Sequence, residues 1–299
     1  MKKIYVIGST MVDMIINVDH LPSTKADIHI SSQTASMGGC AYNVSDTVRN
    51  FDVPNVLFSP VGGGVYGEFV SNGLRKKGLV CPIPPVEGDN GCCYCFVEEG
   101  GERTFVAYHG VEFYFKPEWL NGIDINEVHS VYICGLEIEE KTGDVIVEWL
   151  ERNPQLPVFF APGPRLMKID PALMERIFKL HPIVHLNDDE IKEYFATDDA
   201  QQAMVKLYEK TENTVIVTLG DKGAMWYDGG ETKHAPAVKV DHVVDTIGAG
   251  DSHIGAVMSG LYNGKTMEEA IADANKVAAA VVGVKGALLE KEEFDAVMA

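Results

Sequence analysis

The stretch that decides the fold lies near the C-terminal end and reads Asp245-Thr246-Ile247-Gly248-Ala249-Gly250-Asp251. A valine-rich run at residues 238–244 precedes it, and an amphipathic stretch at residues 252–262 follows it. This order predicts a strand, a tight glycine turn and the start of a helix. Two glycines around one alanine leave the turn almost without side chains, so a ligand can lie directly on the backbone.

The same turn predicts an anion site with an acid beside it. At a helix start, the N–H groups of Ala249, Gly250 and Asp251 have no partner within the helix, and the helix dipole favours an anion there. An acid at Asp251 indicates that its carboxylate does chemistry on a group that approaches the anion. Alternatively, Asp251 only stabilises the first helical turn, as acids do. That alternative explains the aspartate but not the Gly-Ala-Gly before it.

Length and charge limit the class of protein. The chain has 299 residues and a formal net charge of −19, and this length allows one large α/β unit or two domains. The acidic balance argues against a nucleic-acid partner, although backbone donors can still bind a small anion. No apolar run approaches the ~20 residues of a membrane span. The apolar N-terminus reaches Asp13 too soon for a secretory signal, so we expect a cytoplasmic protein with no membrane partner.

The cysteines do not predict a metal site. One C-x-x-C occurs at Cys92 and Cys95, without the second pair or histidine-rich partner that a closed zinc site needs. We expect reduced thiols that pack as small hydrophobes. The six cysteines are Cys40, Cys81, Cys92, Cys93, Cys95 and Cys134.

Apolar runs alternate with helical patterns along the chain, which predicts a mostly parallel sheet with helices on both faces. There is no repeat or linker that would separate independent halves. The predicted strands are residues 3–8, 55–61, 130–134, 157–161, 183–186 and 214–219. The predicted helices are residues 41–50, 66–77, 141–152, 171–180, 188–195 and 200–210.

Two segments interrupt this alternation. Residues 13–36 lack a helical pattern and contain the alternating run Ile28-His29-Ile30, and residues 91–109 are typical of a hairpin with its turn at 98–102. Together they could form a small β-sheet outside the main one. It could be a lid over the sheet edge where ligands bind, or these could be ordinary surface hairpins.

Two further glycine clusters precede predicted helices. Gly38 and Gly39 allow close backbone approach, and Asn43 can both donate to and accept from sugar hydroxyls; a plain glycine turn is the alternative. Residues 62–67 match G-x-G-x-x-G, but the acid that a dinucleotide site needs is missing: Glu87 lies beyond three prolines that exclude a central strand. We therefore reject an NAD-dependent oxidoreductase.

Two strand ends carry polar or glycine-rich turns. Asn187-Asp188-Asp189-Glu190 could hold a hydrated Mg²⁺, and the same residues match a helix capping box. The two roles can coexist. The turn from Thr218 through Gly220 to Gly223 suits a nucleotide site or a hairpin turn equally. The loop at residues 283–287 would allow a ligand to approach the backbone, but such a loop is not specific to any one function.

Taken together, these motifs resemble the PfkB/ribokinase family of small-molecule kinases over essentially the whole chain. Residues 245–251 are similar to its C-terminal signature, and residues 38–78 to its N-terminal one. The resemblance implies one ribokinase-like domain at residues 1–299, a three-layer α/β sandwich with a small β-sheet lid. The lid segments would be about 14–36 and 91–110.

The resemblance also implies an ATP-dependent phosphoryl transfer. Asp251 would be the catalytic base, and Gly248, Ala249 and Gly250 would form the anion hole. Glu190 would act through Mg²⁺. The residues implied to contact ATP are Asn187, Thr218, Gly220, Gly223 and Gly286.

On the acceptor side, the resemblance implies residues that hold substrate hydroxyls: Asp13, Gly38, Gly39 and Asn43. Asp245 and the carbonyl of Ile247 stand where some members bind a monovalent cation such as K⁺. The lid implies a homodimer.

Three positions depart from the family pattern. Gly64 stands where many members carry an aspartate, His253 where a Phe or Ala is usual, and Cys40 where ribokinases proper carry a lysine. These departures weaken a claim to ribose but leave the kinase interpretation intact.

The acceptor stays open. A sugar or sugar phosphate is the first hypothesis, and a ribonucleoside such as pseudouridine is the second, because lid aromatics could stack on a base or merely pack the lid. A non-catalytic sugar or nucleotide sensor with this fold is the rival from another class. The lid aromatics in question are Tyr94, Phe96, Tyr108 and His109.

Overall fold

Eight strands form the larger of two sheets, in the order β12-β11-β10-β9-β8-β7-β1-β4. The computed structural model describes residues 1–79 and 81–299. Strands from β4 to β10 pair in parallel, whereas β11 and β12 pair antiparallel at the opposite edge. The bounds are β1 Lys3–Ile7, β4 Asn55–Phe58, β7 Val128–Cys134, β8 Val158–Ala161, β9 Ile183–Asn187, β10 Val215–Thr218, β11 Ala224–Tyr227 and β12 Lys233–Ala235.

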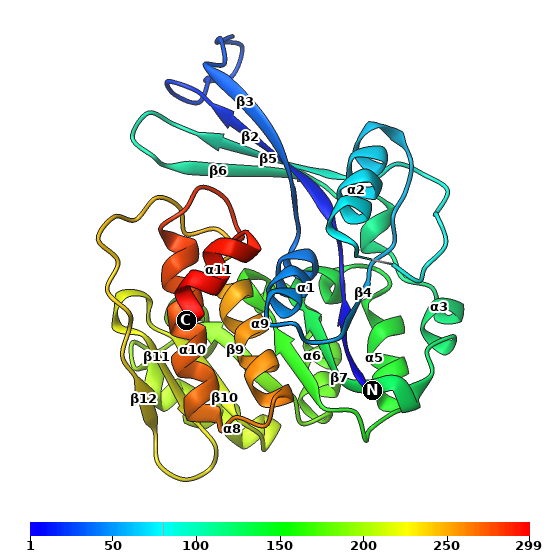
Figure 1. Ribbon diagram of the computed structural model, residues 1–299, viewed down its shortest axis with the longest axis vertical. Coiled ribbons are helices and arrows are strands. Elements are labelled where there is room, and N and C mark those ends of the chain that lie inside the picture. The colour runs from blue at the N-terminus through cyan, green and yellow to red at the C-terminus, as the bar shows by residue number, and fades with distance from the viewer. Residues whose placement is uncertain (80) are drawn as a thin grey trace.

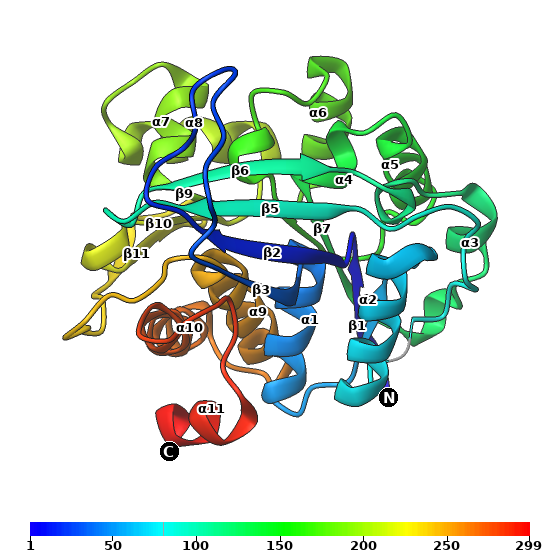
Figure 2. The same cartoon turned by 90° about the horizontal axis from the view of Figure 1, so that it is seen from above.

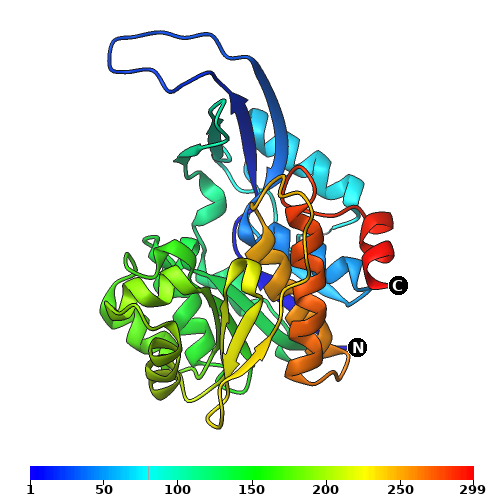
Figure 3. The ribbon, with the colours of Figure 1, turned by 90° about the vertical axis from the view of Figure 1, so that its left-hand side faces the viewer.

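Helices cover both faces of this sheet, and Figure 3 shows the three layers. Successive strand residues point to opposite faces, so that Tyr5 and Ile7 enter one buried core and Ile4 and Val6 the other. Helices α5, α6 and α8 pack in the first core, and α1, α9 and α10 in the second. The helices are α1 Cys40–Asn50, α2 Gly64–Lys77, α3 Pro117–Asn121, α4 Gly135–Glu139, α5 Gly143–Glu151, α6 Pro171–Phe178, α7 Asp188–Phe195, α8 Ala200–Thr211, α9 Ala249–Tyr262, α10 Met267–Val282 and α11 Lys291–Met298.

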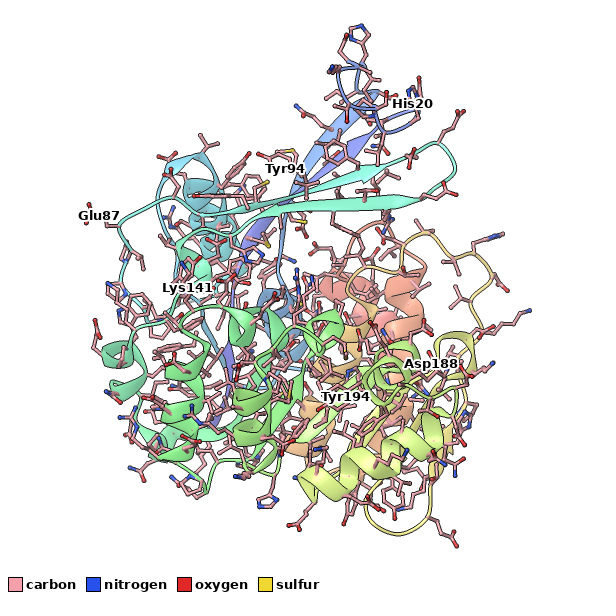
Figure 4. The ribbon with its side chains drawn as sticks, turned by 180° about the vertical axis from the view of Figure 1, so that it is seen from behind. His20, Glu87, Tyr94, Lys141, Asp188 and Tyr194 are labelled. Atoms are coloured by element: carbon pink, nitrogen blue, oxygen red, sulfur yellow. The ribbon has the colours of Figure 1, made fainter. Side chains whose placement is uncertain are left out.

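The smaller sheet has the order β3-β2-β5-β6. Because β1 continues almost directly into β2, this sheet stands beyond the carboxyl ends of the parallel strands (Figures 1 and 2). Figure 4 shows Tyr94 on β5 and His20 near the far end of the β2–β3 connection. The strands are β2 Met11–Asn17, β3 Ser32–Gly38, β5 Cys92–Val97 and β6 Arg103–Tyr108.

Most predicted elements are confirmed, including the predicted three layers and the hairpin of residues 91–109. Its turn closes through a hydrogen bond from the Glu98 N–H to the Glu102 carbonyl, at 3.0 Å. The alternating run Ile28-His29-Ile30 is not a strand: it lies in the connection between β2 and β3, where Ile30 is exposed. Within the described ranges, no helix is long and apolar enough to cross a membrane.

The prediction of a strand at residues 238–244 is wrong. The sheet ends at β12, and Pro236, which lacks an N–H, follows its last residue. Residues 236–248 run instead as an irregular segment, in which the N–H groups of Val244 and Asp245 both donate to the Val282 carbonyl. Val238, Val240 and Val243 line a cavity, which explains an apolar run without a strand.

Candidate active site

The glycine turn lies at the N-terminus of α9, as the sequence predicts. Gly248 is the N-cap with φ of 75°, and a Cβ there would lie 2.4 Å from the Ala287 carbonyl oxygen, so this position requires glycine. Ala249 donates a long hydrogen bond of 3.4 Å to the Thr246 carbonyl. The first bond of the helical ladder runs from the Ser252 N–H to the Gly248 carbonyl, at 2.8 Å. The N–H groups of the first turn therefore face outward from the helix end.

Gly250 has no packing reason to be glycine. A Cβ built there has no described atom within 4 Å, in contrast to Gly248. Because Gly is about 0.5–1 kcal/mol worse than Ala in a helix, the missing side chain costs stability without relieving a clash. This pattern indicates that the space above the turn is kept free for a ligand.

Asp251 lies beside this turn and touches the other half of the chain. The Asn43 side-chain amide donates to its Oδ2 at 2.8 Å, across 208 residues of sequence. Burial raises the pKa of the Asp251 carboxyl to about 6, against the lowering effect of the Asn43 and Cys40 side chains. The buried Asn43 Oδ1 has no hydrogen-bond partner among the described residues, so it can accept from a ligand hydroxyl.

Asp13 lies near Asp251, on β2. Burial raises the pKa of the Asp13 carboxyl to about 6. A Cβ on Gly38 would lie 1.8 Å from Asp13 Oδ2, and Gly39 has φ of 100° and lies close to the Ser9 carbonyl. These two glycines therefore make room for the protein's own Asp13 and Ser9, besides any ligand.

Glu137 is a further acid at this site that the sequence reasoning missed. It is 1% exposed; its Oε1 accepts from the Ser9 N–H at 2.8 Å and its Oε2 from the Cys134 thiol at 2.7 Å. The Cys40 thiol interacts with Cys134 and with Asp251, which links the acids into one cluster. No glycine motif marks Glu137; its place just after the buried strand β7, at the carboxyl edge of the sheet, is the signal that could have found it.

On the other side of the turn lies a cavity of about 510 Å³. The predicted residues Thr218, Gly220 and Gly223 line one side, and Ala249 and Gly250 line another. The remaining wall is mostly apolar, so it fits a flat, weakly polar ring such as a nucleobase. That wall includes Ala237, Val238, Val240, Val243, Ala278, Ala279 and Val282.

The structure contains the capping box predicted at Asn187 and Glu190. The Glu190 N–H donates to Asn187 Oδ1 at 2.8 Å, and Glu190 Oε2 accepts from the Asn187 N–H at 2.9 Å. Burial raises the pKa of the Glu190 carboxyl. Among the described residues, no group of three or more His, Cys, Asp or Glu could hold a metal directly. One acid oxygen beyond the capping bond fits a Mg²⁺ ion that keeps its waters and binds phosphate.

The carboxylate of Asp245 is occupied by donors from the protein itself. Its Oδ1 accepts from the Ile247 N–H at 2.8 Å, and its Oδ2 accepts from the Gly286 N–H at 3.3 Å. Arg103 of β6 forms an ion pair with the same carboxylate. Gly286, predicted to contact ATP, thus contacts Asp245 and does not line the cavity.

The rejected dinucleotide motif at residues 62–67 has its backbone donors in use. The Gly62 N–H donates to Asn90 Oδ1 and the Gly63 N–H to the Gly88 carbonyl, each at 2.7 Å. A Cβ at Gly64 would lie 2.6 Å from Asp89 Oδ1, so Asp89 fills the space of the side chain that many family members carry there.

Comparison with known proteins agrees with this geometry. The family model described as pfkB family carbohydrate kinase matches residues 1–293. The chain belongs to this family. It is therefore a kinase that transfers a phosphoryl group to a hydroxyl acceptor.

Among the curated relatives of the kinase is an uncharacterized sugar kinase, YegV, of Escherichia coli (strain K12), 35% identical over 289 residues, which cover 95% of this chain and 90% of the relative. A deoxyribokinase of Salmonella typhi is 24% identical over 294 residues, or 95% of this chain and 93% of the relative. The solved ribokinase of Thermotoga maritima superposes with a TM-score of 0.85 at 27% identity, covering 100% of this chain and 99% of the other.

The kinase also contains a buried hydrogen-bond chain that explains its unusual His253. His185 on β9 lies 2.9 Å from His253 Nδ1, His253 Nε2 lies 3.2 Å from Asn275 Oδ1, and Asn275 donates to the carbonyls of Ala235 and Pro236. Because the Asn275 NH₂ group donates to these carbonyls, its Oδ1 is the atom that faces His253 and must accept. His253 Nε2 therefore carries a proton, and His253 Nδ1 accepts from His185 Nε2. Burial lowers the pKa of His253 to about 4, so the hydrogen-bond chain is neutral and supports the cavity wall that begins at Ala237, next to Pro236.

Proposed function

We propose that this kinase transfers the γ-phosphoryl group of ATP to a hydroxymethyl group of a small sugar or sugar-like polyol, with Asp251 as the base. The observation that carries this proposal is the 2.8 Å hydrogen bond between Asn43 and Asp251. It brings a residue suited to sugar hydroxyls together with a carboxylate beside an anion-binding helix start. The curated relatives named sugar kinase and deoxyribokinase support a sugar acceptor.

In the proposed reaction, Asp251 accepts the hydroxyl proton while the acceptor oxygen bonds to the γ-phosphorus and the bond to the β–γ bridging oxygen breaks, which releases ADP. A carboxylate with a pKa of about 6 is ionised at neutral pH and is basic enough to help. The outward N–H groups of Gly250 and Asp251 stabilise charge that develops on the phosphoryl oxygens. Mg²⁺, held through water by Glu190, would share that charge.

The adenine ring is proposed to lie in the 510 Å³ cavity, between the turn at Gly220 and the alanines of α10. Its phosphates would then run toward Gly248, Ala249 and Gly250. Asn187, Thr218 and Gly223 complete the proposed ATP side, whereas Gly286, whose N–H donates to Asp245, is left out of it. On the acceptor side, Asp13, Asn43, Glu137 and the backbone at Gly38 and Gly39 would hold hydroxyls.

Two of the four lid aromatics, Tyr94 and His109, favour a sugar over a ribonucleoside. The Tyr94 hydroxyl bonds to the Tyr66 hydroxyl at 3.0 Å, which ties its ring to α2. His109 stacks on Phe113 with ring centroids 3.9 Å apart and bonds Glu140 at 2.5 Å. Because both rings already have partners within the protein, they are poorly placed to stack on a nucleobase.

We further propose that residues 1–299 act as one kinase domain, in which the lid segments 14–36 and 91–110 close over the acceptor. Phe105, Val106 and Tyr108 on β6 are each more than half exposed, and such an edge strand suits pairing with a second copy as a homodimer. The six free thiols suit the cytoplasm. Light scattering of the purified chain tests the dimer.

An ADP-release assay across acceptors tests the proposed function. The panel contains free pentoses and hexoses, their phosphates, and ribonucleosides, each with ATP and Mg²⁺. We expect ADP formation with a free sugar or polyol. ADP formation with ribonucleosides alone would replace the sugar by the nucleoside hypothesis, and nucleotide binding without ADP formation would favour the sensor.

A further inference from the structure

Asp245 lies at the junction of three segments that are distant in sequence. It belongs to the irregular segment before the glycine turn and is 5% exposed. Its carboxylate accepts from Ile247 in the turn, from Gly286 after α10, and from Arg103, which lies 142 residues away. Arg103 is the first residue of β6, so the ion pair connects the small sheet to the segment that leads into α9.

This arrangement does not fit the monovalent cation that the family resemblance suggests at Asp245. A carboxylate has about four acceptor positions, and donors from Ile247, Gly286 and Arg103 already take three of those of Asp245, which leaves little capacity to coordinate K⁺. A second positive charge beside the Arg103 guanidinium would also be repelled. The ion pair with Asp245 raises the pKa of Arg103, which is charged at any pH at which a protein folds.

The ion pair has a clear electrostatic effect on the turn. An unpaired carboxylate at this depth would be costly and would repel a phosphoryl group bound to the nearby helix start. With Arg103 in place, Asp245 is neutralised and still orients the Ile247 peptide through the 2.8 Å bond. That peptide directly precedes Gly248, whose φ of 75° sets the direction of the outward N–H groups.

We propose that Arg103 is a positioning residue that takes the place of a monovalent cation: it neutralises Asp245 from the lid and thereby holds the anion-binding turn, so the kinase needs no K⁺. This inference rests on the proposed function, in which the turn binds the phosphates of ATP. The Arg103 side chain is 23% exposed whereas that of Asp245 is 4% exposed. The guanidinium thus lies on the more exposed side of the pair and belongs to the small sheet, while the carboxylate belongs to the main body.

The test compares Arg103→Gln and Arg103→Lys with the parent kinase and with a matched control, Arg176→Gln. Arg176 forms a bidentate ion pair with Glu151, with N–O distances of 2.8 and 2.7 Å. This pair joins α6 to α5 and lies away from the cavity. The first measurement is the affinity for the Mg²⁺ complex of a non-hydrolysable ATP analogue, by calorimetry. The second is the melting temperature without nucleotide. Both are made in KCl and in tetramethylammonium chloride at equal ionic strength.

We expect the parent and Arg176→Gln to behave alike in the two salts. Arg103→Gln should bind the analogue about tenfold more weakly in tetramethylammonium, as for a lost charged hydrogen bond. K⁺ should restore part of that loss and raise the melting temperature of this variant alone, while Arg103→Lys should lose less in either salt.

Two results would overturn the inference: a parent kinase that K⁺ stabilises or that needs K⁺ to bind the analogue, or an Arg103→Gln variant that matches the parent in both salts. If the parent binds no analogue in either salt, the proposed ATP site fails. The melting temperatures then still decide whether Arg103 stands in for a cation.

Discussion

The proposed nucleotide side and the proposed acceptor side of the candidate site meet at α9 and would recognise their ligands by different physical means. On the nucleotide side, an apolar cavity leads to a turn with bare backbone N–H groups, so recognition depends on shape and on the helix dipole. On the acceptor side, Asn43 bonds Asp251, and the acids Asp13 and Glu137 lie close enough to Asp251 to raise its pKa, so recognition would depend on hydrogen bonds.

This difference predicts how substitutions should act. A site built to bond hydroxyls leaves buried groups unpaired when the ligand lacks them, so it discriminates strongly. The Ser9 and Thr10 hydroxyls and Asn43 Oδ1 are buried without partners among the described residues. Changes on the acceptor side should therefore affect turnover and sugar choice, whereas changes on the nucleotide side should mainly affect the KM for ATP.

The largest expected effect follows from Asp251→Asn. The amide cannot accept the hydroxyl proton, so turnover should fall by about 100-fold or more. Affinity for ATP should stay nearly constant, because the helix-start N–H groups remain. Steady-state kinetics with calorimetric ATP binding checks this, and Asp228→Asn, on an exposed ion pair, is the control. Turnover close to that of the parent would remove Asp251 from the role of base.

The same variant should be more stable than the parent. The folded pKa of Asp251, about 6, lies above the usual value of 3.8, so folding penalises its ionised form. The penalty is absent below about pH 4 and complete above about pH 6, where the difference in pKa corresponds to about 3 kcal/mol. Urea unfolding should give Asp251→Asn the larger free energy of unfolding near about pH 8, with a gap that shrinks as the pH falls. A gap independent of pH would contradict this origin.

Glu137→Gln tests the acceptor side by itself. The amide oxygen can still accept from the Ser9 N–H, but the charge that holds a hydroxyl is lost. We expect kcat/KM for the sugar to fall by about tenfold and the KM for ATP to change little. A change confined to the KM for ATP would place Glu137 outside the acceptor site.

Two glycines of α9 give the smallest and most specific test. Gly250→Ala should stabilise the kinase by about 0.5–1 kcal/mol, since Ala suits a helix better and nothing described lies near its Cβ. It should raise the KM for ATP several-fold by crowding the phosphate. Gly260→Ala should instead lower the free energy of unfolding and leave the KM for ATP unchanged, because its Cβ would lie 2.8 Å from Ala270 Cβ. Equal effects of the two variants would mean that Gly250 has no role toward a ligand.

Features encoded in adjacent residues could be predicted from the sequence. The glycine turn at residues 248–250 and the capping box at Asn187 are local, because their geometry depends on neighbours within one helical turn. The valine run at residues 238–244 was misread because an apolar cavity wall and a buried strand have the same composition.

Contacts between distant segments could not be predicted. No pattern near Glu137 in the sequence predicts its hydrogen bond with the Ser9 N–H. No pattern near Asp245 predicts its ion pair with Arg103. The same holds for the buried hydrogen-bond chain from His185 to Asn275. It explains the histidine at position 253, but it forms only where three elements pack together. The topology of the two sheets brings these residues together, and local sequence patterns do not reveal that topology.

The hydrogen bond between Asn43 and Asp251 joins residues 208 positions apart in the chain, so the proposed site is complete only after both have been synthesised. Synthesis proceeds from the N-terminus, so α1 and both sheets leave the ribosome before α9 does. A growing chain that holds Asp13, Asn43 and Glu137 still lacks Asp251, the proposed base, and the glycine turn, the proposed phosphate site. On the proposed mechanism, a nascent chain therefore cannot consume ATP before α9 has packed against α1.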